Sequence, residues 1–141
     1  MVVACDEDHV AAVALAEGQR HDAPLAEPVL AEAAAALGGF DQVLGDKGFD
    51  SDAIRMTCLD VHDALPVIPN RDTRTDPWPW DDVMTQIDRQ RNRVERVIGK
   101  AKQVRRFATR YEKLSEMYLA VVRLVFGFIH VRKLARTVNT A

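Results

Sequence analysis

Residues 40–51 read FDQVLGDKGFDS, and within this stretch the chain changes from a strand to a helix. The apolar residues Val43 and Leu44 predict a short buried strand over 42–44, since apolar runs bounded by turn residues are typical of one. The run ends in a turn around Asp46, and Ser51 or Asp52 can cap the helix that follows. A strand, a tight turn and a helix in direct succession indicate an α/β protein.

Strand and helix patterns on both sides of this stretch predict the order β-β-α-β-α-β-α-α. The first helix should stop at Gly38-Gly39, because glycine favours the backbone conformation that ends a helix. The expected elements cover residues 2–5, 10–16, 23–37, 42–44, 52–60, 64–69, 83–106 and 113–137. The sequence shows no internal repeat and no linker, which predicts a single domain, 1–141, with a mixed sheet and helices on its faces.

The charge is distributed very unevenly along the chain. The 141 residues are 48% apolar, enough for a globular core, and the net charge is only −2. Residues 1–82 carry 5 Lys and Arg against 17 Asp and Glu, a balance of −12, whereas residues 83–141 carry 14 against 4, a balance of +10. Two interpretations are open: the basic half contacts nucleic acid, or it neutralises the acidic half of its own chain.

The cysteine and hydropathy patterns favour a reducing cytosol and argue against a membrane anchor. Cys5 and Cys58 lie far apart, without metal-ligand spacing, and are expected to be buried thiols. The acidic start of the chain lacks the cationic region of a signal peptide. The apolar segment 117–131 is short for a bilayer and contains Arg123, which favours a buried core helix.

The segment 89–106 holds eight Lys and Arg residues but a single carboxylate, Glu95. On a helix at 100° per residue, Arg91, Glu95 and Lys102 fall within roughly 40° of one another. One interpretation is a solvated helix with an Arg91–Glu95 ion pair worth about 0.3 kcal/mol. The other is a phosphate-binding surface, since a purely basic face lies beside this flank. That basic face comprises Arg89, Arg93, Arg96 and Lys100.

Asp46 is the second acid of interest, because it ends a strand that looks buried. Sites in open α/β sheets form at the carboxyl ends of strands, although a turn-forming Asp is an equal alternative. Mg²⁺ is commonly held by few protein carboxylates together with the phosphates of its substrate. Asp46 and Glu95 together would suit metal-assisted chemistry on a phosphodiester, with neighbouring cations holding the backbone.

Several segments, in this order, resemble a known protein family. LGDKGFDSDAIR, residues 44–55, resembles the ADKGYDS segment of transposases from bacterial insertion sequences, the DDE group with a ribonuclease H-like fold. DRQRNRVERVIGKAKQVRRFATRYEKL, residues 88–114, resembles the glutamate helix of the same family. LAEGQRHDAP, residues 15–24, is similar to the family's segment between a hairpin and the next helix. The resemblance therefore spans nearly the whole chain.

The resemblance implies a role for individual residues. The family's glutamate helix often shows Tyr, Arg, Glu and Lys at fixed spacing, and Arg91, Glu95 and Lys102 match it. Asp88 occupies the Tyr position, which is a departure from the pattern. By the resemblance, Asp46 is the second catalytic acid and Glu95 the third, and both are ligands of Mg²⁺ or Mn²⁺. The implied DNA-binding residues are Arg91, Lys102, Lys47, Arg89, Arg93 and Lys100.

The family's first catalytic acid has no counterpart in this chain. The family places it on an opening strand ahead of the hairpin, and this sequence begins at the hairpin. Asp6 and Asp8 are poor substitutes, since they fall in the expected turn after the first strand. The expectation is a truncated ribonuclease H-like domain that lacks the opening strand and has little or no activity alone.

Three functions follow as alternatives. The first is a transposase domain for metal-dependent DNA cleavage and strand transfer, which meets insertion-sequence ends and target DNA at the nucleoid in the cytoplasm. The second is a non-catalytic fragment that binds DNA or the full-length transposase and interferes with it. The expected protein partners are full-length transposase or further copies of the chain in a homo-oligomer. The third is an inactive remnant. The loop residues Trp78 and Trp80 either stack on a DNA base or, more simply, cover an edge of the core.

Overall fold

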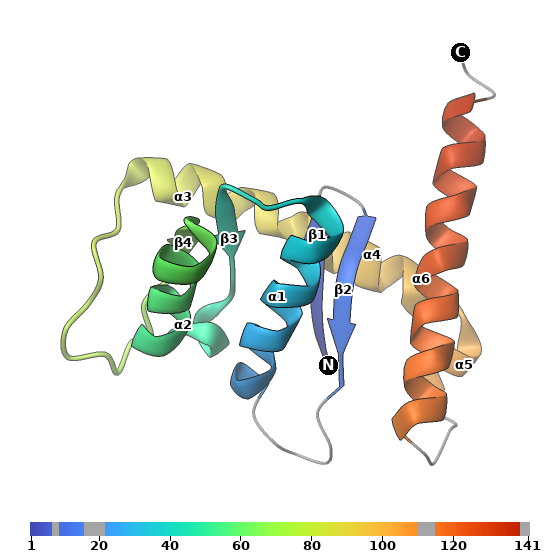
Figure 1. Cartoon of the computed structure of the whole chain (residues 1–141), viewed down its shortest axis with the longest axis horizontal. Helices are drawn as coiled ribbons and strands as arrows, with labels where there is room; N and C mark the ends of the chain where they lie inside the picture. Colours follow the sequence, from blue (N-terminus) through green and yellow to red (C-terminus); the bar gives the residue numbers. More distant parts are fainter. Residues whose placement is uncertain (7–8, 16–21, 110–114, 139–141) are drawn as a thin grey trace.

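A computed structural model describes residues 1–6, 9–15, 22–109 and 115–138. Four strands and two helical layers make up this part of the chain (Figure 1). The helices α1, Ala26–Leu37, and α2, Asp52–Met56, lie in front of the strands. The segment from α3, Asp82–Asp88, to α4, Asn92–Lys102, crosses behind them. The α/β prediction is therefore confirmed.

The strands form two small sheets rather than the single mixed sheet that we expected. β1, Val2–Asp6, and β2, His9–Ala14, pair antiparallel, with an irregularity after Ala4. β3, Gln42–Leu44, and β4, Leu65–Val67, pair parallel. Within the described residues neither β1 nor β3 has a second strand partner. Local sequence patterns indicate strands but not which strands meet, so they could not reveal this division.

The helices of the front layer follow their sequence signals closely. A 3₁₀ turn, η1 at Ala23–Leu25, leads into α1, which ends at Gly38 in the left-handed conformation with φ 78°. Glycine carries no Cβ, so this conformation costs it little. One side of α1 is buried against the first sheet, as expected for an amphipathic helix. α2 continues as one π-helical turn, η3, at Thr57–Val61.

The back layer differs from the one long helix that we predicted over residues 83–106. The structure divides this segment into α3, Asp82–Asp88, a 3₁₀ turn η4, Arg89–Arg91, and α4, Asn92–Lys102. A short helix α5, Arg105–Thr109, follows after a turn. The spacing of apolar residues is similar in 3₁₀ and α-helical turns, so the sequence pattern does not distinguish them over so few residues.

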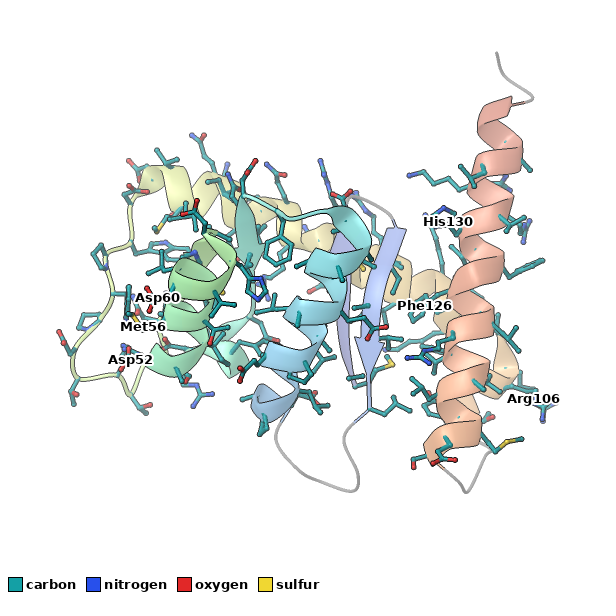
Figure 2. The ribbon with its side chains drawn as sticks, in the orientation of Figure 1. Asp52, Met56, Asp60, Arg106, Phe126 and His130 are labelled. Carbon is teal, nitrogen blue, oxygen red and sulfur yellow. The ribbon has the colours of Figure 1, made fainter. Side chains whose placement is uncertain are left out.

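The last helix, α6 at Ser115–Val138, stands at one end of the molecule beside β2 (Figure 1). Its inner side contributes to the main core, and Phe126 points toward β2 (Figure 2). Its outer side is exposed, so the predicted core helix is buried on one face only. No helix among the described ranges has the length and apolar character needed to cross a membrane. The residues of the main core include Val97, Ala101, Phe107, Tyr118, Val122, Val125 and Phe126.

The prediction for the cysteines is confirmed for Cys58, which belongs to η3 and is fully buried. Burial raises the pKa of the Cys58 thiol to about 11, because the charged thiolate is poorly solvated there. Cys5 is half-buried in β1, and neither cysteine forms a disulfide.

Candidate metal and nucleic-acid site at the end of β3

Asp46 lies one residue beyond β3, at the carboxyl end of a strand as the sequence indicated, but β3 is only half-buried at Val43 and Leu44 and not fully buried as expected. It caps a 3₁₀ turn, η2 at Lys47–Phe49, by accepting a hydrogen bond from the Gly48 backbone N–H on Oδ1 at 2.7 Å. A Cβ at position 48 would lie 2.8 Å from this oxygen, so only glycine fits without moving the carboxylate. The Asp46 side chain is exposed to solvent. The turn therefore presents a carboxylate in a defined orientation.

The turn is fastened to the loop that follows β4. Lys47 Nζ forms an ion pair with Asp72 Oδ1 at 2.7 Å. The Arg71 guanidinium donates from Nε to the Lys47 carbonyl and from Nη2 to the Gly48 carbonyl, at 2.7 and 2.6 Å. These contacts join segments separated by more than twenty residues. The ion pair with Asp72 engages the Lys47 ammonium, for which DNA binding stays a prediction.

A buried ion network centred on Asp50 adjoins the η2 turn. Asp50 Oδ1 accepts from both Arg55 and Arg74, each at 2.9 Å, and Oδ2 accepts from the Arg71 backbone N–H at 2.7 Å. Arg55 also donates to the Ile68 carbonyl at 2.6 Å. The Asp50 and Arg55 side chains are 1% and 2% exposed, so their charges depend on each other. The network ties the η2 turn, α2 and the loop after β4 into one unit.

The same network shifts two pKa values. Burial disfavours the ionised form of Asp50, but the Arg71 N–H and the Arg55 and Arg74 guanidinium groups outweigh it and hold the pKa of Asp50 below its usual range. The pKa of Asp52 is also lowered, first by the hydrogen bond from the Trp78 indole and then by Arg74. The sequence indicated Asp52 only as one of two possible caps of the following helix.

The two tryptophans have different surroundings. Trp78 donates its indole N–H to Asp52, which Figure 2 shows at the start of α2, and its ring lies 5.4 Å from the Arg55 guanidinium carbon. This supports the interpretation that Trp78 covers a core edge. Trp80 donates to Thr85 Oγ1 at 3.0 Å and lines a pocket beside Asp46. A contact with DNA remains an expectation for Trp80.

The pocket beside Asp46 has a volume of about 570 Å³ and brings together opposite charges from distant segments. Asp46 and Lys47 come from the η2 turn, whereas Asp88 and Arg91 come from the back layer. Arg91 Nε lies 3.2 Å from Asp88 Oδ1. The partner shown for Arg91 is thus Asp88, not Glu95 as the ion-pair interpretation supposed. The pocket is lined by Asp46, Lys47, Gly48, Pro69, Trp80, Thr85, Asp88 and Arg91.

Glu95 does not line this pocket; it is an exposed residue of α4, one helical turn beyond Arg91. Two of the segments that resemble the family therefore come together at Asp46 and Arg91. That Asp46 and Glu95 lie close enough to share a metal ion stays a prediction. Most of the cations expected to bind DNA form an exposed basic surface along η4 and α4, with Arg93 half-buried. These residues are Arg89, Arg93, Arg96, Lys100 and Lys102.

The weaker candidates can also be placed. Asp6 is exposed at the end of β1, and Asp8 lies outside the described residues. Figure 1 shows β1 and β3 running in opposite directions, so Asp6 and Asp46 follow opposite ends of neighbouring strands. Within the described ranges, no group of three or more His, Cys, Asp or Glu residues is close enough to hold a metal ion.

Sequence reasoning missed the contribution of Asp88 to the pocket and the central position of Asp50. The sequence shows that Asp88 stands where the family often has Tyr. It does not show that Asp88 lines the same pocket as Asp46. For Asp50, the signal was weaker, because a buried Asp in a Gly-rich turn has the same local pattern as an exposed one.

Comparison with known proteins supports the resemblance. A family model described as "Transposase DDE domain" matches residues 43–132, which is more than half of the chain. Neither the search of curated proteins nor that of solved structures returned a match. The matched range includes the η2 turn, the pocket and the basic surface.

Proposed function

The chain belongs to the transposase DDE domain family, and from this membership we propose that it takes part in cleavage and transfer of DNA strands at an insertion sequence. The observation that carries the proposal is the pocket in which Asp46 and Arg91 meet. These residues come from two of the segments that resemble the family, and both lie in the matched range 43–132. An acid and an arginine in one pocket fit a phosphodiester held near a divalent cation.

We propose that Asp46 and Glu95 hold Mg²⁺ or Mn²⁺. Asp46 uses one carboxylate oxygen in the turn, which leaves Oδ2 available for a ligand, and Glu95 is exposed and therefore accessible. When bound, the cation would activate the attacking oxygen and stabilise the leaving one. Arg91 would bind a phosphate oxygen with its guanidinium, and its pairing with Asp88 would orient it.

The basic surface would hold the DNA backbone. Its exposed cations can neutralise several phosphates, which gives affinity without sequence readout. Lys47 is a weaker contributor in this proposal, because its ammonium already pairs with Asp72. The same proposal expects the protein at the nucleoid, with insertion-sequence ends and target DNA as its partners.

The metal site of this chain is proposed to be incomplete. The described residues contain no cluster of three potential ligands, and a family member would need a further acid. The expectation is that the 141-residue chain cleaves DNA slowly or not at all. In this proposal, full-length transposase or a second copy of the chain supplies the missing acid.

A nuclease assay with Mg²⁺ or Mn²⁺ tests the catalytic part of this proposal. We expect little cleavage of double-stranded DNA by the wild-type chain. Rapid cleavage that Asp46→Ala abolishes, and that the control Asp41→Ala leaves intact, would show that the site is complete and our proposal of incompleteness wrong. Asp41 is a suitable control because it is an exposed acid just before β3 and does not line the pocket.

A second candidate function is DNA binding without catalysis, and the exposed basic surface favours it. It would allow the chain to compete with an active transposase for DNA. Fluorescence anisotropy should show affinity that falls steeply with salt, and Arg89→Ala with Lys100→Ala should reduce the slope by about 2. The matched control is Arg132→Ala, which removes an exposed cation from α6, outside the basic surface. Affinity that is independent of salt would refute both functions on this surface.

A further inference from the structure

The helix α6, at one end of the molecule, has an apolar surface on the side that faces away from the core (Figure 1). Its inner side holds Tyr118, Val122 and Phe126, which are buried in the main core. At 100° per residue, the exposed apolar residues lie on the opposite side, within an arc of roughly 120°. A surface helix normally carries polar residues there. The large exposed residues, with their exposed fractions, are Met117 57%, Leu124 74%, Phe128 59%, Val131 62% and Leu134 51%.

This surface has about the area that one side of a dimer interface needs. A fully exposed apolar side chain of this size offers roughly 150 Å², so the five residues together present about 450 Å². Two such surfaces face to face would bury about 900 Å² of apolar area, before their polar rims are added. With the rims, the total reaches about 1,200 Å², the lower limit for a specific interface. A second copy of the chain is therefore large enough to cover α6.

The charged residues of α6 lie beside this surface rather than within it. Arg123 forms an ion pair with Glu32 of α1 at 3.7 Å, and the Arg132 guanidinium carbon lies 5.6 Å from the centre of the Phe128 ring. Protein interfaces commonly combine an apolar centre with a polar rim in this way. Among the described residues of α6, the centre offers no charge by which an anionic partner such as DNA could bind. A second copy, in contrast, brings a matching apolar surface.

Along the exposed side, apolar residues follow the seven-residue repeat of paired helices. They recur at alternating spacings of three and four over residues 117–134. This spacing keeps one line of residues directed at a partner helix, and here that line is about 27 Å long. We call these six residues the α6 seam, and all of them are exposed. They are Met117, Ala120, Leu124, Gly127, Val131 and Leu134.

The sizes of the seam residues favour an antiparallel pair of helices. With a two-fold axis between residues 125 and 126, Leu124 of one copy lies level with Gly127 of the other. Val131 lies level with Ala120 in the same way, so each of these large side chains meets a small one. A parallel pair would instead bring Gly127 against Gly127 and leave a void in the seam, which is unfavourable.

The charges near the two ends of α6 favour the same orientation. Glu116 lies in the first turn, whereas Arg132, Lys133 and Arg136 lie toward the carboxyl end. An antiparallel pair brings the basic end of one helix toward the acidic end of the other. A parallel pair would gather the basic ends of both copies, and like charges repel each other.

We propose that α6 pairs with α6 of a second copy of this chain, antiparallel about a two-fold axis and along the α6 seam. The expected dissociation constant lies in the micromolar range, because the area is close to the lower limit for a specific interface. This inference concerns the assembly of the chain and does not depend on the catalytic proposal.

Sedimentation velocity of the full chain, from about 1 to about 300 μM, measures the association. We expect a monomer–dimer equilibrium that Leu124→Glu weakens at least about a hundredfold, since the pair would bury carboxylates without partners. Gly127→Gln should weaken it at least about tenfold, because the new side chain takes the place of Leu124 of the other copy. The matched control is Gly99→Gln in α4, which should leave the association unchanged. At both glycines a Cβ meets nothing within 4 Å in the single chain, so both variants should fold.

Disulfide formation reports the orientation of the two helices. Ala120→Cys and Val131→Cys in one chain lie about 16 Å apart along the helix, too far for a disulfide within that chain. In the antiparallel pair the two thiols lie level, so oxidation by air with copper phenanthroline should join the double variant into a covalent dimer. Neither single variant should be joined, whereas a parallel pair would join both. The wild-type chain, with Cys5 and Cys58, gives the background.

The proposal is supported if both seam substitutions weaken the dimer, Gly99→Gln does not, and only the double cysteine variant is joined. A chain that stays monomeric over the whole concentration range would overturn it. A dimer that Gly127→Gln leaves intact would also overturn it, since that dimer must use another surface. Covalent dimers of the single cysteine variants would overturn the antiparallel arrangement.

Discussion

At the scale of single residues, Asp50 shows how one charge can hold several segments together. Its carboxylate receives two guanidinium groups and a backbone N–H, and its side chain is 1% exposed. A buried ion pair is not necessarily stabilising compared with apolar residues, but removing one partner leaves a buried charge without compensation. The η2 turn and Asp46 lie directly before Asp50 in the chain, so their geometry depends on this network.

We predict that Asp50→Asn lowers the free energy of unfolding by about 3 kcal/mol, because Arg55 remains buried without its counter-charge. Urea denaturation followed by circular dichroism measures this change. The matched control is Asp52→Asn, whose carboxylate is 69% exposed and should matter much less. Equal effects of the two substitutions would contradict the role assigned to Asp50.

The lowered pKa of Asp50 also predicts how stability depends on pH. An unfolded Asp has a pKa of about 3.9, and the folded value is lower, so the unfolded state binds a proton more readily. The contribution of Asp50 is therefore fully present above about pH 4 to 5 and is lost as the pH falls through its folded pKa. Urea midpoints between pH 6 and pH 2 should fall less steeply for Asp50→Asn than for wild type. An unchanged slope would argue against this assignment.

At the scale of elements, α4 combines a buried side with an exposed basic surface. Val97 and Ala101 are buried in the main core, while Arg96, Lys100 and Lys102 face solvent. The helix also contains Gly99, which is exposed, and a Cβ there would meet nothing within 4 Å. The basic surface therefore lies on a helix that a substitution at Gly99 can stabilise.

We predict that Gly99→Ala raises the free energy of unfolding by up to about 1 kcal/mol, since alanine favours a helix interior more than glycine does. Thermal denaturation gives the change. As a matched glycine, Gly48→Ala should instead destabilise the protein, because the new Cβ would lie 2.8 Å from Asp46 Oδ1 and displace the capping carboxylate. A stabilising effect at both positions would show that the η2 turn is not as constrained as described.

At the scale of the whole molecule, the main core joins parts of the chain that are remote in sequence. Val13 of β2 packs in the same cluster as Val97 of α4 and Val122 of α6. The outer side of α6 takes no part in this core, and Leu124 is 74% exposed. The two sides of one apolar helix therefore contribute very differently to folding.

We predict that Val122→Ala destabilises the protein by about 2 kcal/mol, because Val122 is completely buried and the change leaves a cavity. Leu124→Ala should change the free energy of unfolding by less than about 0.5 kcal/mol. Chemical denaturation of both variants at low protein concentration measures the difference. A large loss with Leu124→Ala would indicate that a further surface covers α6 in solution.

The sequence by itself determined the α/β class, the strand before Asp46, the end of α1 at Gly38 and the family. These features depend on local signals, namely apolar spacing, glycine in special backbone conformations and motif spacing, which neighbouring residues carry together.

Only the tertiary structure decided which charges meet. It joined Asp46 with Asp88 and Arg91, buried Asp50 between arginines, and left four strands as two pairs around a cavity. Contacts between residues twenty or more positions apart depend on how elements pack, and many packings are compatible with the same local pattern. For that physical reason, the candidate acids could be named from the sequence, but their neighbours could not.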